Sequence, residues 1–178
     1  MLGEKLCLRA DPWFQVSKQT IALPDGRVVD DYYQIQQRDY VEIVVRNDCG
    51  LILGLWRYKH GPRRVNLGLP AGYLEEGESP RGAAERELLE ECGLASESWS
   101  PLGVFHLDGN RSTARCHVWL AERCIPMPRV PSDDLEQSRT EWMELDQWME
   151  HLETGAVATL AVAGSILLYH FKISKRPL

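Results

Sequence analysis

The sequence predicts an α+β domain in which helices cover a mixed β-sheet, an α/β/α sandwich preceded by an N-terminal β-hairpin region. The first half of the chain alternates β-rich runs with turn sequences, and one well-delimited helix follows. The C-terminal third holds two further helical segments. A length of 178 residues with 44% hydrophobic content fits one domain with its own core, residues 1–178.

Strands are expected over much of residues 5–46. Residues 18–23 and 28–36 are β-rich runs joined by the turn sequence Pro-Asp-Gly, which predicts a hairpin. Residues 40–46 and 51–58 form a second predicted pair, joined by Asn-Asp-Cys-Gly.

A helix is expected over residues 79–92. Ser79 is a favourable N-cap, Pro80 suits the first helical position and Gly93 suits the residue that ends the helix. An apolar stripe at four-residue spacing would dock the helix on the sheet: Ala84, Leu88 and Cys92.

After this helix, strands are expected near Phe105 and over residues 116–121, followed by a Pro-rich loop over residues 125–131. Residues 145–153 and 156–171 are predicted helices. The second contains the longest apolar stretch of the chain, which is shorter than the roughly 20 residues needed to span a bilayer, so a buried helix is expected.

Charge and cysteine content narrow the class of function. A net charge of −6 disfavours nonspecific binding to nucleic acid or to an anionic membrane, so neither is an expected partner. The five cysteines form no C-x-x-C pair, which argues against a zinc site or a disulfide framework. With no signal-peptide pattern at the N-terminus, a cytoplasmic location is expected.

Three glutamates of the predicted helix indicate a divalent-cation site. Glu87, Glu90 and Glu91 are spaced i, i+3 and i+4, so their carboxylates share one face within a turn. Like charges this close destabilise a helix unless they are neutralised. Mg²⁺ prefers oxygen ligands and is usually held by one or two carboxylates together with substrate phosphates. A solvated acidic face is the alternative interpretation.

The loop before the helix argues for the cation site. Pro70-Ala71-Gly72 would make a tight turn that can direct the Ala71 carbonyl toward the same cation. Glu78 is placed to accept hydrogen bonds from amides at the helix N-terminus. Arg86, inside the helix, can pair with a loop carboxylate and hold the loop against the helix.

Residues 72–94, called the box below, read G-x5-E-x7-R-E-U-x-E-E-x-G-U, where U is a bulky apolar residue. Every defined position is filled: Gly72, Glu78, Arg86, Glu87, Leu88, Glu90, Glu91, Gly93 and Leu94. The box resembles the signature of the Nudix hydrolases. The resemblance implies the α/β/α sandwich and hydrolysis of a nucleoside diphosphate linked to another group, with Mg²⁺, or Mn²⁺ in its place, held by the box helix.

The resemblance also implies roles for single residues. Glu87 and Glu91 would be the main metal ligands, Glu90 an auxiliary ligand with a catalytic part, and the Ala71 carbonyl a further ligand. Bound metal would neutralise the diphosphate and activate a water. Arg86 is counted with the catalytic residues, and the structural positions of the box are Gly72, Glu78 and Gly93.

Much of the remaining chain is similar, more weakly, to the ADP-ribose pyrophosphatase branch of that family. The branch forms dimers through N-terminal strands, so residues 1–38 are expected to mediate a homodimer and residues 39–178 to form the catalytic core. Two departures, at residues 66–68 and 107–109, leave open the number of metals and the choice between ADP-ribose and another nucleoside diphosphate sugar.

The catalytic base of the branch often lies on a loop between the box and the last helices. Residues 132–140 occupy that place in this chain. Glu136 is the predicted base, and Asp134 and Glu141 are the alternatives.

Candidates for substrate binding lie mostly before the box. A basic cluster could hold the anionic end of a nucleotide, with an ordinary charged loop as the alternative: Arg57, Lys59, His60, Arg63 and Arg64. Trp56 and Tyr32 could stack on a base, an interaction that contributes about 1–3 kcal/mol, although most tryptophans are core or interface residues. Glu42 stands out in an apolar strand and receives no role.

The leading hypothesis is hydrolysis of ADP-ribose or a related nucleoside diphosphate sugar to a nucleoside monophosphate and a sugar phosphate. A hydrolase of nucleoside triphosphates or dinucleoside polyphosphates is disfavoured by the long N-terminal strand region. A non-catalytic nucleotide sensor is disfavoured by the intact glutamates.

Overall fold

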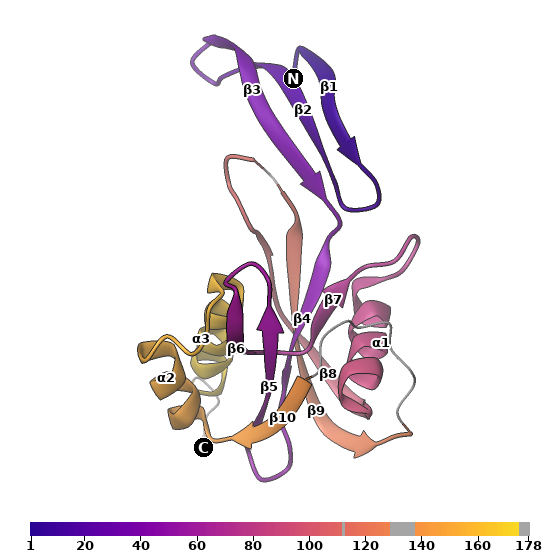
Figure 1. The fold of residues 1–178 in the computed structure, drawn as a ribbon, viewed down its shortest axis with the longest axis vertical. Coiled ribbons are helices and arrows are strands. Elements are labelled where there is room, and N and C mark those ends of the chain that lie inside the picture. Colours follow the sequence, from indigo (N-terminus) through magenta and orange to yellow (C-terminus); the bar gives the residue numbers. More distant parts are fainter. Residues whose placement is uncertain (112, 129–137, 175–178) are drawn as a thin grey trace. The chain divides into compact units, whose positions relative to one another are not determined.

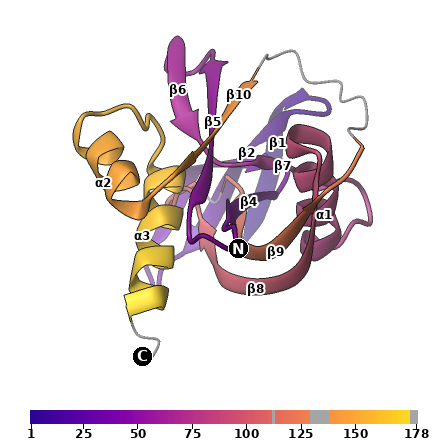
Figure 2. The ribbon, with the colours of Figure 1, turned by 90° about the horizontal axis from the view of Figure 1, so that it is seen from below.

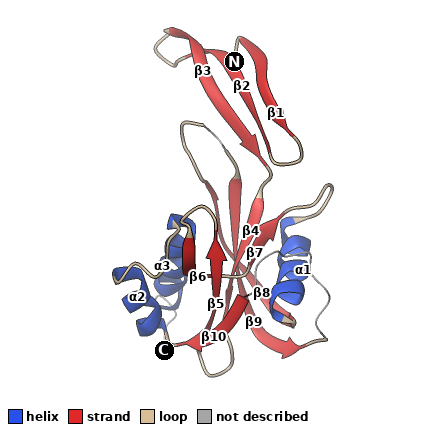
Figure 3. Cartoon of the chain, in the orientation of Figure 1, coloured by secondary structure: helices blue, strands red, loops and turns tan. Residues whose placement is uncertain are grey.

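Strands make up most of the first half of the chain and helices close it, as the sequence predicted (Figure 3). A computed structural model describes residues 1–111, 113–128 and 138–174 (Figure 1). The chain divides into two units, residues 1–39 with 104–116 and residues 40–103 with 117–178.

The first unit is an antiparallel sheet in the order β1-β2-β3. Its strands are β1 (Gly3–Ala10), β2 (Phe14–Ala22) and β3 (Val28–Gln37). The predicted Pro-Asp-Gly hairpin joins β2 to β3, and β1 adds a third strand that the sequence did not single out. Residues of the 104–116 segment run along β3, where the Gln37 amide donates to the Thr113 carbonyl at 2.7 Å.

The second unit contains two sheets, in the orders β7-β4-β9-β8 and β10-β5-β6. Strands of the first sheet are β4 (Tyr40–Val45), β7 (Ala71–Tyr73), β8 (Leu94–His106) and β9 (Arg115–Pro126). Strands of the second are β5 (Ile52–Lys59), β6 (Arg64–Gly68) and β10 (Ser138–Met143).

Three helices cover these sheets: α1 (Pro80–Cys92), α2 (Leu145–Glu153) and α3 (Leu160–Ser174). Figures 1 and 2 show α1 on one side of the sheets and α2 with α3 on the other, and the predicted α+β class with helices on a mixed sheet is confirmed. No helix in the described ranges is long and apolar enough to cross a bilayer.

Helix α1 begins and ends where its capping residues predict. The Gly82 amide donates to the Ser79 hydroxyl at 3.0 Å, and Pro80 opens the helix. Gly93 adopts the left-handed conformation, with φ of 64°, and its amide donates to the Leu89 carbonyl. Local capping chemistry thus fixes both ends of the box helix.

Strand β4 separates two apolar cores, because successive side chains of a strand point to opposite faces. Val41, Ile43 and Val45 pack in one core with Ala84 and Leu88 of α1, as the predicted stripe requires. Val44 faces the other core, which is built with residues of α2 and α3 such as Trp148, Ile166 and Tyr169. By this alternation Glu42 belongs to the face of β4 that α3 covers.

Several predicted boundaries are wrong. The last helix begins at Leu160 rather than at residue 156, because the Ala156 carbonyl accepts from the Leu67 amide and Val157 bridges Leu67. Ile125 and Pro126 continue β9 instead of starting a loop. Residues 138–140, expected in a loop, belong to β10, which pairs with β5.

Candidate active site

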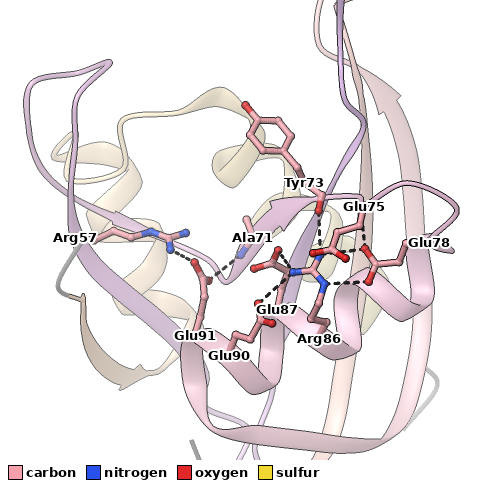
Figure 4. Close-up of polar contacts among 9 residues, drawn as sticks. All are labelled: Arg57, Ala71, Tyr73, Glu75, Glu78, Arg86, Glu87, Glu90 and Glu91. Atoms are coloured by element: carbon pink, nitrogen blue, oxygen red, sulfur yellow. Dashed lines mark hydrogen bonds and ion pairs between the residues drawn. The ribbon is translucent and has the colours of Figure 1, made fainter. Parts of the chain in front are cut away.

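The acidic face of α1 meets the turn between β6 and β7, as the sequence predicted. Glu87 and Glu91 are buried, with 9% and 8% of their surface exposed, while Glu90 is partly buried. In the described parts of the chain, no group of three or more His, Cys, Asp or Glu residues is gathered around one point. Two arginines, Arg86 and Arg57, divide the box carboxylates between them (Figure 4).

Arg86 connects the helix to the loop before it. Its Nε and Nη2 donate to the two carboxylate oxygens of Glu78, both at 3.0 Å, and Nη2 also donates to the Tyr73 carbonyl. Its Nη1 donates to Glu87 at 2.7 Å and to Glu90 at 3.1 Å. The prediction that Arg86 pairs with a loop carboxylate is confirmed.

Glu78 has different partners from those predicted. The structure gives its carboxylate the Arg86 fork and the Glu75 amide, at 2.9 Å, rather than amides of the helix N-terminus. Ser79 takes that capping role, because it is the residue directly before the helix. The hydrogen bond from Arg86 keeps the pKa of Glu78 below its ordinary value.

Arg57 holds the opposite end of the acidic face. This buried guanidinium donates through Nη1 to Glu91 Oε1 and through Nη2 to the Leu69 carbonyl, at 3.0 Å. The other oxygen of Glu91 accepts from the Ala71 amide at 3.0 Å. The structure therefore separates Arg57 from the exposed residues of the predicted basic cluster.

Gly72 lies directly against Glu87. A Cβ atom at position 72 would be 1.8 Å from Glu87 Oε1, so only glycine leaves room for this carboxylate. Burial raises the pKa of Glu87 to about 7, and the charges of Glu91 and Glu90 act in the same direction against the lowering effect of Arg86. A further positive charge beside Glu87 would favour its ionised form and lower its pKa again.

The donor set suits a hard divalent cation by its chemistry, and in this structure Arg57 and Arg86 pair with its carboxylates. Glu87, Glu90 and Glu91 present carboxylate oxygens on one helix, and the glycine turn brings backbone against the same face. Oxygen ligands from one or two carboxylates are what Mg²⁺ uses in sites that also bind substrate phosphates.

The candidate bases are only partly described. Glu136 and Asp134 lie outside the described residues. Glu141 lies on β10, where its Oε2 accepts from Trp56 Nε1 at 2.7 Å and pairs with Arg139 at 3.0 Å.

The candidate substrate-binding residues have different partners within the protein. Trp56 and His151 form a T-shaped pair, and the Arg139 guanidinium lies 5.7 Å from the centre of the Trp56 ring. Arg64 donates to the Gly155 carbonyl at 2.7 Å, and Lys59 faces Arg64 across the β5–β6 ladder. Tyr32 belongs to the first unit, where its hydroxyl donates to the Asn110 carbonyl at 2.6 Å.

Glu42 and Ser165 are polar residues of the interior to which the sequence reasoning gave no role. Glu42 on β4 is 3% exposed and accepts from the hydroxyl of Ser165 on α3, which is 1% exposed. Burial raises the pKa of Glu42 to about 7, while Ser165 and Arg57 act to lower it. A charged residue inside an otherwise apolar strand was the available signal.

The class of this protein is defined by its α+β fold and by helix α1. This helix is capped at both ends, and its acidic face packs against the turn that contains Gly72. The family model described as NUDIX domain matches residues 36–161, more than half of the chain, and the chain belongs to that family.

Named proteins are similar in sequence to most of the chain. It is 26% identical over 152 residues to CMP-5'-(N-acetyl-N-hydroxy-3-aminopropyl)phosphonate hydrolase of Streptomyces rubellomurinus, covering 85% of this chain and 73% of that protein. It is 27% identical over 160 residues to ADP-ribose pyrophosphatase of Mycobacterium tuberculosis, covering 88% and 76%. The crystal structure of an ADP compounds hydrolase matches with a TM-score of 0.85 at 21% identity, over 97% of this chain and 92% of that one, which shows the shared fold.

Proposed function

We propose that this chain is a pyrophosphohydrolase that cleaves the diphosphate of ADP-ribose or a related nucleoside diphosphate sugar into a nucleoside monophosphate and a sugar phosphate. The observation that carries the proposal is the acidic face of α1, closed by Gly72 against Glu87 and by Ala71 against Glu91. The named bacterial relatives, hydrolases of a CMP-phosphonate and of ADP-ribose, support a nucleotide substrate.

In this proposal Glu87 and Glu91 hold Mg²⁺, or Mn²⁺ in its place, with Glu90 as an auxiliary ligand and the Ala71 carbonyl as a further one. The bound cation would neutralise the diphosphate and lower the pKa of an attacking water. Arg86 keeps the loop closed on the helix.

Residues outside the box complete the proposed reaction. Glu136 takes the proton of the attacking water as general base, with Asp134 and Glu141 as alternatives. Lys59 and Arg64 meet the charge of the substrate, and either Trp56 or Tyr32 stacks on its base.

A homodimer formed through residues 1–38 is part of the proposal. Large apolar side chains of this segment are exposed to solvent, which is unusual for a surface that stays uncovered: Leu6 at 50%, Leu8 at 51%, Trp13 at 62% and Tyr33 at 51%. A cytoplasmic location and the absence of nucleic-acid and membrane partners remain proposals from charge and cysteine content.

The test is a hydrolysis panel with Mg²⁺ and product chromatography. It includes ADP-ribose, several nucleoside diphosphate sugars, a diadenosine polyphosphate and nucleoside triphosphates. AMP with ribose 5-phosphate from ADP-ribose supports the proposal, and preference for another diphosphate sugar keeps the chemistry while changing the substrate. Turnover of triphosphates alone contradicts it, and metal binding without any turnover points to a nucleotide sensor.

The matched variants are Glu91→Gln and Glu85→Gln on the same helix. Glu85 is exposed and pairs with Arg81, so its loss should leave turnover near the wild-type value. Glu91→Gln removes a proposed ligand and should lower kcat by about 10²-fold or more. Equal activity of the two variants would contradict the role given to Glu91.

A further inference from the structure

Several polar side chains outside the box are buried in the described part of the chain. Glu42 on β4, Arg57 on β5 and Ser165 on α3 have 3%, 8% and 1% of their surface exposed. Taking charged groups out of water costs several kcal/mol per ion, and apolar residues in the place of a buried ion pair are often at least as stable. Stability alone is therefore a weak explanation for these residues.

Arg57 closes a ring of contacts at one end of the acidic face. Its two terminal nitrogens join Glu91 to the Leu69 carbonyl, and the other oxygen of the Glu91 carboxylate accepts from the Ala71 amide. The ring returns through Pro70, whose carbonyl accepts from the Ile43 amide of β4 at 2.9 Å. The helix carboxylate and the turn are thus tied to each other by one guanidinium.

Glu42 is a second buried carboxylate on which the charge of Arg57 acts. It lies opposite Ala71 in the β4–β7 ladder, and Ser165 donates a hydrogen bond to its carboxylate. Electrostatic attraction from Arg57 acts on this carboxylate and lowers its pKa against the effect of burial. Arg57 is therefore influenced by one carboxylate inside the box and by one outside it.

We propose that Arg57 is a positioning residue that sets Glu91 and the 69–71 turn in place for the divalent cation. This role rests on the proposed metal-dependent function and replaces the substrate contact that the sequence suggested for Arg57. Both directions of its guanidinium fork are used within the protein, and its side chain is buried.

The pair of carboxylates explains how a positive residue can lie beside a cation site. A cation near Glu91 repels the guanidinium, and without a counter-charge this repulsion would displace Arg57 from the turn. In its ionised form Glu42 attracts Arg57 from outside the box and acts against that displacement. Ser165 in turn holds Glu42, so the last helix contributes to the order of the site.

The decisive variant is Arg57→Lys in the full chain. Lysine keeps the positive charge but cannot bridge two acceptors with a planar fork. Mn²⁺ binding without nucleotide is measured by titration calorimetry, and kcat and KM are measured with the best substrate of the wild type. Partners that orient metal ligands typically contribute 10–100-fold, so the Mn²⁺ affinity and kcat should each fall by about 10-fold or more, with KM nearly unchanged.

The matched control is Arg81→Lys, which makes the same change in an exposed pair with Glu85 on α1. It should leave Mn²⁺ affinity, kcat and KM at wild-type values. Glu42→Gln is the second variant and serves if Arg57→Lys does not fold. It removes the outer counter-charge and should weaken Mn²⁺ binding in the same direction by a smaller factor, with circular dichroism confirming the fold.

The outcomes separate this role from the proposed function. If the wild type binds Mn²⁺ but hydrolyses nothing in the panel, the function fails and a loss of Mn²⁺ affinity in Arg57→Lys still supports the positioning role. If the wild type is active and Arg57→Lys raises KM alone, with unchanged Mn²⁺ affinity, Arg57 is a substrate contact and the role is overturned. A wild type that binds no Mn²⁺ overturns both.

Discussion

The sheet β1–β3 and the layered unit around β4 hold their strands together by different means. In β1–β3 every strand pairs along nearly its whole length, yet Ser17 is the single buried residue of the three strands. In β4 five of six residues are buried. Backbone hydrogen bonds thus contribute most to the N-terminal sheet, whereas burial of apolar surface contributes most to the stability of the layered unit.

This contrast indicates where each unit tolerates change. The box depends on a packed core, since Ala84 and Leu88 of its helix are fully buried against β4. The N-terminal sheet keeps apolar residues such as Leu8 and Trp13 at its surface, which the proposed dimer would cover. Matched substitutions in the two units test this difference.

The largest expected effect comes from removing a core side chain. Leu55 is fully buried, and Leu55→Ala should lower the free energy of unfolding by about 2–5 kcal/mol. Leu8 is 51% exposed, and Leu8→Ala should change it by no more than about 0.5 kcal/mol in dilute protein. Denaturant unfolding measures both, and similar losses would contradict the contrast.

Substituting a glycine should lower turnover in one unit and leave it unchanged in the other. Gly72→Ala places a Cβ atom against the Glu87 carboxylate, and a displacement of about 1 Å at a catalytic group can lower turnover by about 10²-fold. A Cβ atom on Gly3 in β1 meets nothing within 4 Å, so Gly3→Ala is the control. Unchanged kcat for Gly72→Ala would show that Glu87 can move without loss.

The carboxylates of the two units should respond to pH in opposite directions. The pKa of Glu87 is raised to about 7 in the folded protein, mainly by burial, so the folded state holds the proton more tightly than the unfolded state. The contribution of Glu87 to the free energy of unfolding is complete below pH 4.5 and is lost as pH rises to about 7. This loss is on the order of 2–3 kcal/mol. Glu42 titrates in the same direction.

Glu4 on β1 behaves in the opposite sense. Hydrogen bonds from Ser17 and Gln19 lower its pKa, so its contribution is present above pH 4.5 and is lost as pH falls. The free energy of unfolding of the metal-free protein should therefore fall between pH 5 and pH 8. Glu87→Gln should make this fall smaller, and Glu4→Gln should leave it unchanged. A decline that survives in Glu87→Gln at full size would contradict the assignment.

The smallest effect on the isolated chain is expected for a charge on the N-terminal sheet. Leu8→Lys should leave the unfolding of dilute protein nearly unchanged, because residue 8 is half exposed. If residues 1–38 form the dimer interface, the same substitution should convert a dimer of twice 20.3 kDa into a monomer in light scattering. A wild type that is already monomeric would remove the dimer proposal.

Features with local causes were predictable from the sequence. The ends of α1 follow from Ser79 and Gly93, and the Arg86–Glu78 pair follows from their spacing in the box. The hairpin at the Pro-Asp-Gly turn and the limits of α2 also agree with local signals.

Features that depend on distant partners were not predictable. The polar strand β10 exists because it pairs with β5, and residues 156–157 leave the helical pattern because they contact Leu67. In the sequence Arg57 looks like part of an exposed basic cluster. The neighbouring residues do not indicate that its side chain pairs with Glu91, 34 residues later. The same holds for Glu42, whose partner on α3 is 123 residues away.

That last separation has a consequence for synthesis of the protein. At about 5–20 residues per second, Ser165 is added to the growing chain roughly 6–25 s after Glu42. By then the box, Arg57 and the 69–71 turn have all been made, while Glu42 still lacks the hydroxyl that α3 supplies. A nascent chain released before α3 would therefore carry the complete signature of its family and an unfinished site.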